Sequence, residues 1–402
     1  MSGQVEVFLS SCANIMAKRD IGSMMRSLQI GLRWSSKVSG GAERVFADLS
    51  AALPEVGIGF TGAVAGPADL DVTTNGLIYA FAPENGRTTS RLRGARRKVM
   101  QLLDRQNPDL LASHFALYTA PILDRLSERP FYMHFHGPWA LEMRVEGASK
   151  AGVLTMRSIE RLVYRRADRV IVLSQAFGTL LHREYGIAEH RIRIVPGAVD
   201  LDRFTRKLGR REARQVLGWP TDRPILLSVR RLVNRMGLLQ LVEAMASVRR
   251  HVPEVLLCIG GRGPLRPVLE QRVEQLGLTE SVHFLGFLSE EALPLAYRAA
   301  DLSVIPTAAL EGFGLVAAES LAAGTPAIVT PVGGLPDVVN ELSQSLIFRS
   351  GNPADLADGL VAALLGQVHL PDETECRAYA VKNFSRSLMA SRIAAVYRET
   401  LD

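Results

Sequence analysis

The hydrophobic and polar positions of this chain form short β-rich runs that alternate with longer stretches of helical spacing. A strand is expected at residues 27–33, followed by a Gly/Ser loop and a helix at 41–53. Helices also fit at 89–106 and 155–166. Further β-rich runs of the first half lie at residues 57–65, 77–81, 109–114, 130–136, 169–174 and 191–196. Such alternation predicts a parallel sheet with helices on both faces.

A second cycle of the same kind begins after the charged stretch 202–214. It predicts strands at residues 224–230, 255–260, 281–286, 301–306 and 326–330, with helices at 237–251, 264–276, 289–299, 314–323 and 335–340. The expected fold class is therefore α/β, with two doubly wound, Rossmann-like domains facing across a crevice. Ligands of such folds bind at the carboxyl ends of the strands, so the crevice is the expected site.

The two cycles set the expected domain boundaries. Residues 1–26 are expected to be an N-terminal extension outside the fold, residues 27–205 the first domain, and residues 206–384 the second. A last helix within residues 385–402 follows the polar segment 371–375 and is expected to pack back towards the first domain.

Composition excludes several classes of protein. Of 402 residues, 47% are hydrophobic and 22% charged, which is typical of a globular chain. Three cysteines with no CxxC pair argue against a disulfide framework or structural zinc, and favour a reducing compartment. The longest apolar stretch, 313–332, is interrupted by Glu, Gly and Pro, so it does not predict a membrane span. Near the start, Lys18 and Arg19 follow the apolar stretch instead of preceding it, which argues against a secretory signal.

The net charge of +6 lies in the first half of the chain. Residues 1–205 hold 26 Lys and Arg against 20 Asp and Glu, whereas residues 206–402 hold 21 of each. The densest basic cluster comprises Arg87, Arg91, Arg93, Arg96, Arg97 and Lys98. A basic surface suits anionic lipid, an anionic saccharide or nucleic acid, and an ordinary solvated helix face explains it equally well. No aromatic residues interleave the arginines, as a single-strand binder would need.

The most informative local feature is the segment Glu-Gly-Phe-Gly-Leu at 311–315, followed by Glu319. An expected strand feeds this loop, and an expected helix begins near Gly314. The two glycines let the backbone approach a ligand closely, and amides at a helix N-terminus point outward. Two carboxylates at such an entrance suit sugar hydroxyls, which need acceptors. Isolated glutamates here would be read as a surface residue and a dipole-favoured first-turn residue. The whole string favours a ligand site.

The Glu311 and Glu319 pair, within EGFGLVAAESLAAGTPAIVTPVGGLPDVV, resembles the E-x7-E signature of family 4 retaining glycosyltransferases of the GT-B fold. Other segments occur in the order that this family shows, and together the resemblance covers roughly residues 27 to 400. They are VSGGAERVFADLS, HFHG, VPGAVDLDRF, SVRRLVNRMGLLQLVEAM and FLGFLSEEALPLAYRAADLSVIPT.

The resemblance implies three catalytic residues. His136, at the end of an expected strand, would contact and orient the donor sugar, although a lone His at a strand end is more often structural. Arg231 would neutralise the charge that grows on the leaving diphosphate. Glu311 would stabilise positive charge on the sugar ring.

The resemblance also implies a set of donor-binding residues. Glu319 would hold the ribose hydroxyls, and the other members would bring backbone amides, turns or cations to the sugar and diphosphate. The full set is Gly40, Gly41, Arg231, Arg235, Gly263, Phe313, Gly314, Leu315 and Glu319.

One departure from the family pattern concerns the diphosphate. The family has Gly-Arg-Leu-x-x-x-Lys-Gly, and here Met236 stands where the lysine should be. A thioether cannot neutralise a phosphate, so Arg230 or Arg235, both close in sequence, are the candidates to replace it. The chain therefore either uses a variant phosphate site, prefers an unusual donor or is catalytically weak.

The implied reaction is retaining transfer of a hexosyl group from a nucleotide diphosphate sugar to a hydroxyl of a saccharide or lipid-linked saccharide. The resemblance suggests a cytoplasmic enzyme of cell-surface polysaccharide or lipopolysaccharide synthesis, able to dock peripherally on an anionic membrane. No cofactor, metal ion or nucleic acid is expected. Two alternatives stay open: a GT-B epimerase or phosphorylase, and a degenerate, non-catalytic subunit that binds sugar nucleotides.

Overall fold

The computed structural model describes residues 24–34, 40–205 and 208–400. Almost all of the expected N-terminal extension, 1–26, lies outside the described residues. The chain divides into two compact units. Unit 1 comprises Met1–Leu141, Ser149–Ala198 and Arg386–Asp402, and unit 2 comprises Glu142–Ala148 and Val199–Ser385. The chain therefore passes from unit 1 to unit 2 at residue 199, a few residues before the boundary expected at 205.

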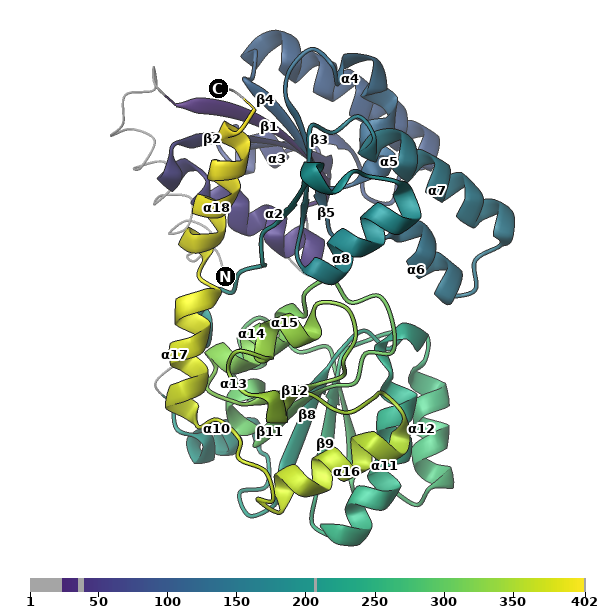
Figure 1. Ribbon diagram of the computed structural model, residues 1–402, viewed down its shortest axis with the longest axis vertical. Coiled ribbons are helices and arrows are strands. Elements are labelled where there is room, and N and C mark those ends of the chain that lie inside the picture. Colours follow the sequence, from purple (N-terminus) through teal and green to yellow (C-terminus); the bar gives the residue numbers. More distant parts are fainter. Residues whose placement is uncertain (1–23, 35–39, 206–207, 401–402) are drawn as a thin grey trace. The chain divides into compact units, whose positions relative to one another are not determined.

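Unit 1 is built on a parallel sheet with the strand order β3-β2-β1-β4-β5-β6-β7 (Figure 1). All residues of β4 and β5 are buried, as is usual where helices cover both faces of a parallel sheet. The strands are β1 (Met25–Arg33), β2 (Ile58–Ala65), β3 (Ile78–Ala82), β4 (Leu110–Ser113), β5 (Phe131–Phe135), β6 (Arg169–Val172) and β7 (Ile192–Ile194).

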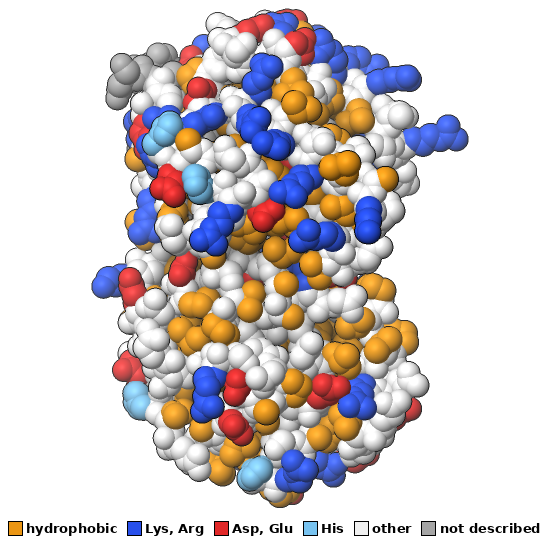
Figure 2. Space-filling model, turned by 45° about the vertical axis from the view of Figure 1, so that its right-hand side comes forward, with side chains coloured by type: hydrophobic (Ala, Val, Ile, Leu, Met, Phe, Trp, Pro, Cys, Tyr) orange, Lys and Arg blue, Asp and Glu red, His pale blue; other side chains and the backbone are white. Residues whose placement is uncertain are grey.

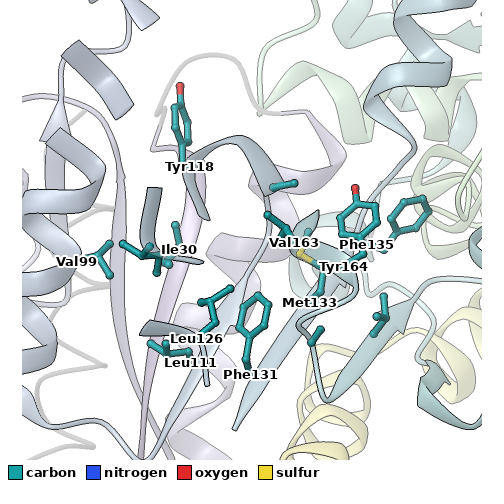
Figure 3. Close-up of a cluster of buried hydrophobic side chains, with 14 of the residues drawn as sticks. Ile30, Val99, Leu111, Tyr118, Leu126, Phe131, Met133, Phe135, Val163 and Tyr164 are labelled. Atoms are coloured by element: carbon teal, nitrogen blue, oxygen red, sulfur yellow. The ribbon is translucent and has the colours of Figure 1, made fainter. Parts of the chain in front are cut away.

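The helices of unit 1 cover this sheet with apolar side chains. In Figure 3, Val99 and Val163, from α4 and α7, lie in one cluster with Ile30, Leu111 and Phe131 of the strands. The helices are α2 (Gly41–Ala52), α3 (Leu70–Thr73), α4 (Thr88–Gln106), α5 (Ala116–Thr119), α7 (Lys150–Tyr164), α8 (Gln175–Leu180) and α18 (Arg386–Arg398). The last of these, α18, packs against α2 although more than three hundred residues separate them in sequence.

Unit 2 has a smaller parallel sheet, with the order β10-β9-β8-β11-β12. Its strands are β8 (Ile225–Val229), β9 (Leu256–Gly260), β10 (Val282–Gly286), β11 (Leu302–Ile305) and β12 (Ala327–Val329). Its helices are α9 (Leu201–Phe204), α10 (Arg210–Leu217), α11 (Leu238–His251), α12 (Arg266–Gln275), α13 (Ala292–Ala299), α14 (Leu315–Ala322), α15 (Leu335–Val339), α16 (Pro353–Leu364) and α17 (Glu373–Asn383). Helix α11 packs against α12 and α16, whereas α13 packs against α10 and α14.

The expected α/β class with two doubly wound domains is confirmed, because both sheets are parallel and each is covered by helices. The hydrophobic pattern does not predict α16 or α17, nor α6 (Trp139–Val145), whose residues from Glu142 onwards belong to unit 2. Among the described residues, no helix combines the length and apolar character needed to cross a bilayer.

Candidate functional site

In unit 2, the loops after β8, β9 and β11 are joined by backbone hydrogen bonds. The Leu232 amide donates to the Arg262 carbonyl over 3.0 Å, and the Ala308 amide donates to the Arg235 carbonyl over 2.9 Å. Gly263 lies where a Cβ atom would collide with the carbonyl of Leu232. Glycine at 263 therefore permits the close approach of two loops at the carboxyl edge of the sheet. This loop packing places Gly263 beside the predicted site residues.

Glu311 lies in the loop after β11 and is held by a cationic neighbour. Its carboxylate accepts hydrogen bonds from Arg230 and from the Thr307 hydroxyl, at 3.4 Å for the latter. Both partners of the ion pair are largely buried, with 5% and 15% of the Arg230 and Glu311 side chains exposed. Burial alone would raise the pKa of Glu311, but the Arg230 guanidinium outweighs it and holds that pKa below its usual value. We call Glu311, Arg230 and Thr307 the Glu311 cluster.

The backbone that follows Glu311 presents free amides. Gly314 has φ +91° and is the N-cap of α14, a conformation that suits glycine. Among the described residues, the amides of Phe313, Gly314 and Leu315 have no hydrogen-bond acceptor. The Phe313 side chain is buried and packs edge-on against Phe384, with ring centroids 5.5 Å apart. This packing fixes the loop, so the three amides are available to an anionic or polar ligand.

Glu319 lies on α14 and is buried, with 4% of its surface exposed. One carboxylate oxygen accepts a hydrogen bond from the Tyr297 hydroxyl over 3.1 Å. The sequence does not indicate this partner, because Tyr297 belongs to α13 and reads there as an ordinary apolar position.

Arg231, Met236 and Arg235, in the segment where the family has its lysine, lie in three different environments. Arg231 is exposed, and its guanidinium forms no hydrogen bond or ion pair among the described residues, although its charge acts on Glu142 and Arg235. Met236 is 5% exposed and belongs to the hydrophobic core of unit 2, together with Leu238 and Leu241. Met236 is therefore a packing residue, and Arg231 is the cation of this segment that is not already engaged.

Arg235 is buried and engaged on two sides. It forms an ion pair with Glu142 at 3.2 Å and donates to the Leu310 carbonyl over 3.0 Å. Burial raises the pKa of Glu142 and lowers that of Arg235. Glu146, from the same segment as Glu142, accepts weak hydrogen bonds from the amides of Asn234 and Arg235. Arg235 therefore fixes the 308–311 loop, in which Leu310 has the rare positive φ of 58°.

In unit 1, Gly40 and Gly41 lie at the start of α2, with Gly40 as its N-cap. Glu43, in the first turn, forms an ion pair with Arg33 at 2.8 Å. The residues 35–39 between β1 and this helix lie outside the described part of the chain.

His136 follows β5 and stacks in a row with two other histidines. Its ring is nearly parallel to that of His114, which is in turn stacked on His134, with centroids 5.1 and 4.3 Å apart. His114 Nδ1 lies 2.9 Å from His136 Nε2, and His114 Nε2 lies 3.1 Å from Gln29 Oε1. Burial lowers the pKa of His136 to about 4, and burial followed by the other two rings lowers that of His114 far below its usual value. The three rings are therefore neutral at pH 7.

Several of these partners were missed by sequence reasoning. One signal could have found His114, because it follows β4 as His136 follows the neighbouring parallel strand β5, and such positions meet at one edge. No comparable signal marks Gln29, in the middle of β1, or Glu142. Within the described part of the chain, no group of three or more His, Cys, Asp or Glu is arranged to hold a metal ion.

Two doubly wound sheets, with a Glu-bearing loop, free amides and a cation at the carboxyl edge of the second, match what is expected of a glycosyltransferase of the GT-B fold. The model of "Glycosyltransferase Family 4" matches residues 39–203, and that of "Glycosyl transferases group 1" matches residues 209–383. The chain belongs to this family of glycosyltransferases.

Curated relatives are similar over part of their length. The 2-deoxystreptamine glucosyltransferase of Streptomyces kanamyceticus is 30% identical over 274 residues, which is 66% of this chain and 70% of that protein. The D-inositol 3-phosphate glycosyltransferase 2 of Catenulispora acidiphila is 34% identical over 253 residues, which is 60% of this chain and 58% of that protein. The matched segment thus spans less than two thirds of the second relative.

Solved structures share the fold over nearly the whole chain. Sucrose-phosphate synthase from Thermosynechococcus elongatus has a TM-score of 0.78 at 22% identity, covering 94% of this chain and 99% of that one. The Anabaena protein HepE in complex with UDP-glucose has a TM-score of 0.73 at 23% identity, covering 93% of this chain and 99% of that one. At these identities the likeness concerns the fold.

Proposed function

We propose that this protein is a retaining hexosyltransferase that moves a sugar from a nucleotide diphosphate sugar to a hydroxyl of a saccharide or lipid-linked saccharide. The observation that carries the proposal is the combination of the Glu311 carboxylate with the free amides of Phe313, Gly314 and Leu315 on one fixed loop. A carboxylate suits sugar hydroxyls or developing positive charge, and amides suit phosphate oxygens. A donor that carries both a sugar and a diphosphate matches both.

The proposed mechanism is a front-face substitution. The acceptor hydroxyl attacks the anomeric carbon from the side that the diphosphate leaves, and a diphosphate oxygen takes the acceptor's proton. Glu311, ionised because of Arg230, stabilises positive charge on the sugar ring. Arg231 and the free amides neutralise the leaving diphosphate, so we expect activity to persist in a chelator such as EDTA. His136 contacts the donor sugar.

The first experiment is a thermal-shift series with UDP, GDP, ADP and their common sugars. The structural neighbour HepE was solved in complex with UDP-glucose, so UDP-glucose heads the series. We expect one nucleotide to raise the Tm, and Glu319→Gln, which keeps an acceptor for Tyr297, to abolish the shift. Glu280→Gln, at an exposed position of unit 2, is the matched control. No shift with any nucleotide would contradict the proposal.

A non-catalytic sugar-nucleotide-binding subunit is the second candidate, and the packing of Met236 favours it. With Met236 in the core and Arg230 and Arg235 both ion-paired, Arg231 alone remains for the diphosphate in this segment of the described chain. Binding of a nucleotide sugar without transfer to water or to any saccharide would select this reading. Conversion of the donor without a saccharide acceptor would select an epimerase or phosphorylase.

The basic helix α4 suits a role at an anionic membrane in cell-surface polysaccharide synthesis. Arg93 and Arg97 are exposed one turn apart, whereas Arg96 is neutralised by a bidentate pair with Asp124. Figure 2 shows Lys and Arg side chains gathered over unit 1 on the face drawn. We expect Arg93→Glu with Arg97→Glu to weaken binding to phosphatidylglycerol vesicles at low salt, and Arg250→Glu to have little effect. Equal binding by all variants would remove the membrane from the proposal.

A further inference from the structure

The hydrogen bonds that connect Ser27 to His136 have a fixed donor-to-acceptor direction, because the first acceptor is a backbone carbonyl. The carbonyl of Gly59 can only accept, and the Ser27 hydroxyl donates to it over 2.7 Å. Because this uses the single hydroxyl proton, Ser27 Oγ must accept from Gln29 Nε2, 3.0 Å away. The orientation of the Gln29 amide is thereby set, and its Oε1 faces His114.

The same argument fixes the donors and acceptors of His114 and His136. Gln29 Oε1 is an acceptor, so His114 Nε2 carries the proton that bridges their 3.1 Å separation. A neutral imidazole has one N–H, so His114 Nδ1 is an acceptor. His136 Nε2, 2.9 Å away, must then donate to it. His136 Nδ1 is left without a proton, and it is buried with no hydrogen-bond partner among the described residues.

We propose that Ser27, Gln29 and His114 form a relay that holds His136 in its Nε2–H tautomer, so that Nδ1 is presented as a hydrogen-bond acceptor for a donor-sugar hydroxyl. This inference rests on the proposed function for the identity of the ligand. Gln29 and His114 are positioning residues, because they act through His136. A hydroxyl can donate to Nδ1, whereas the oxygens of a carboxylate or phosphate have no proton to give and are repelled there.

The geometry supports a fixed relay in preference to a freely rotating ring. Gln29 is 0% exposed, and His114 is 4% exposed and is held edge-on by Phe46, with centroids 5.0 Å apart. Gln29 Nε2 also donates to the Tyr397 hydroxyl over 3.2 Å, which uses its second proton and keeps the amide from turning over. Depressed pKa values of His114 and His136 agree with neutral rings.

The test is 15N NMR of the full chain labelled at histidine, because the protonated and bare nitrogens of a neutral imidazole differ widely in chemical shift. We expect His136 to be protonated at Nε2 in the unliganded protein. In Gln29→Met, which removes the acceptor, both tautomers should appear, and the KM for the donor should rise about 2- to 12-fold with little change in kcat. Tyr118→Phe, which removes a tyrosine hydroxyl of unit 1 that bonds Arg91 and no residue of the relay, is the control and should keep the tautomer.

A second pair of variants keeps the test decisive if Gln29→Met does not fold. His114→Asn retains an oxygen that can accept from His136, and should preserve the tautomer. His114→Phe retains the ring stacking without the acceptor, and should lose it. Protonation of His136 at Nδ1 in the wild type, or an unchanged tautomer in both Gln29→Met and His114→Phe, would overturn the relay.

Ligand addition separates the relay from the proposed function. The nucleotide sugar found by thermal shift should move the His136 Nδ1 resonance in the direction of an accepted hydrogen bond, and the free nucleoside diphosphate should not. The expected tautomer without any nucleotide binding would leave the relay standing and refute the proposed donor. An Nδ1 resonance that both ligands leave unchanged would refute the assignment of the sugar hydroxyl.

Discussion

The two units order their candidate site residues by different physical means. In unit 2, the Glu311 cluster depends on charge, since a buried guanidinium keeps a buried carboxylate ionised. In unit 1, the relay from Ser27 to His136 contains no charge, and its order comes from the direction of successive hydrogen bonds. A buried ion pair produces a strong electric field, but removing one partner leaves an uncompensated buried charge that destabilises the fold. A neutral relay exerts a weaker electrostatic effect, yet it specifies which nitrogen of an imidazole ring can accept a hydrogen bond.

The largest effect is expected from breaking the charged cluster. Arg230→Met leaves Glu311 buried without its cation, and should lower the free energy of unfolding of unit 2 by about 3–5 kcal/mol. Adding Glu311→Gln should recover much of this loss, because no buried charge then remains. Arg272→Met, which breaks the half-exposed pair with Glu243, is the control and should cost less than about 1 kcal/mol. Denaturant unfolding measures all of these, and equal costs for the two arginines would contradict the role given to burial.

A comparable effect, on rate instead of stability, is expected at Arg231. Because this side chain is exposed and unpaired, Arg231→Ala should leave the Tm nearly unchanged. The loss of one electrostatic donor to the leaving group should lower kcat about 100- to 1000-fold. Steady-state kinetics compared with Arg250→Ala, an exposed arginine at the end of α11, provides the measurement. A kcat within threefold of wild type would remove Arg231 from the mechanism.

A smaller effect is expected in the pH dependence of the stability of the two units. Unfolded histidines take up protons below about pH 6.5, whereas folded His136 does so only near pH 4, so unit 1 should lose stability as the pH falls through this window. The Glu311 pKa is also depressed, but its unfolded value is 4.5, so its contribution is complete above that pH and lost below it. Between pH 6 and 5, amide exchange should therefore quicken around β4 and β5 before it does around residues 306–314. The reverse order would contradict these assignments.

The smallest effect is expected at Met236. Since its side chain packs in the core of unit 2, Met236→Leu should cost less than about 1.5 kcal/mol and leave donor affinity unchanged. Thermal unfolding and donor titration check this. A large loss of affinity would show that the thioether contacts the ligand.

The fold could be predicted from the sequence because buried parallel strands leave continuous apolar runs between helices. Helix α17 could not, since it is polar and depends on a capping box between Asp372 and Glu375 that reads equally as a loop. Sequence reasoning can name candidate site residues where a motif lies in one continuous segment, as at Glu311 and Glu319. It does not name them where partners meet only through folding, as for Gln29 with His114 or Arg235 with Glu142.

Helix α18 gives unit 1 an unusual order of assembly during synthesis. Its Tyr397 is fully buried and accepts a hydrogen bond from the Gln29 side-chain amide, so the packing and hydrogen bonding around Gln29 are complete only when this helix is in place. Among the described elements α18 is the last to leave the ribosome, after the whole of Val199–Ser385. Most of unit 2 can therefore reach its final structure before α18 is available to pack onto unit 1. A chain truncated after residue 385 should hold a protease-resistant unit 2 and a protease-sensitive unit 1, the opposite of the usual N-terminal-first order.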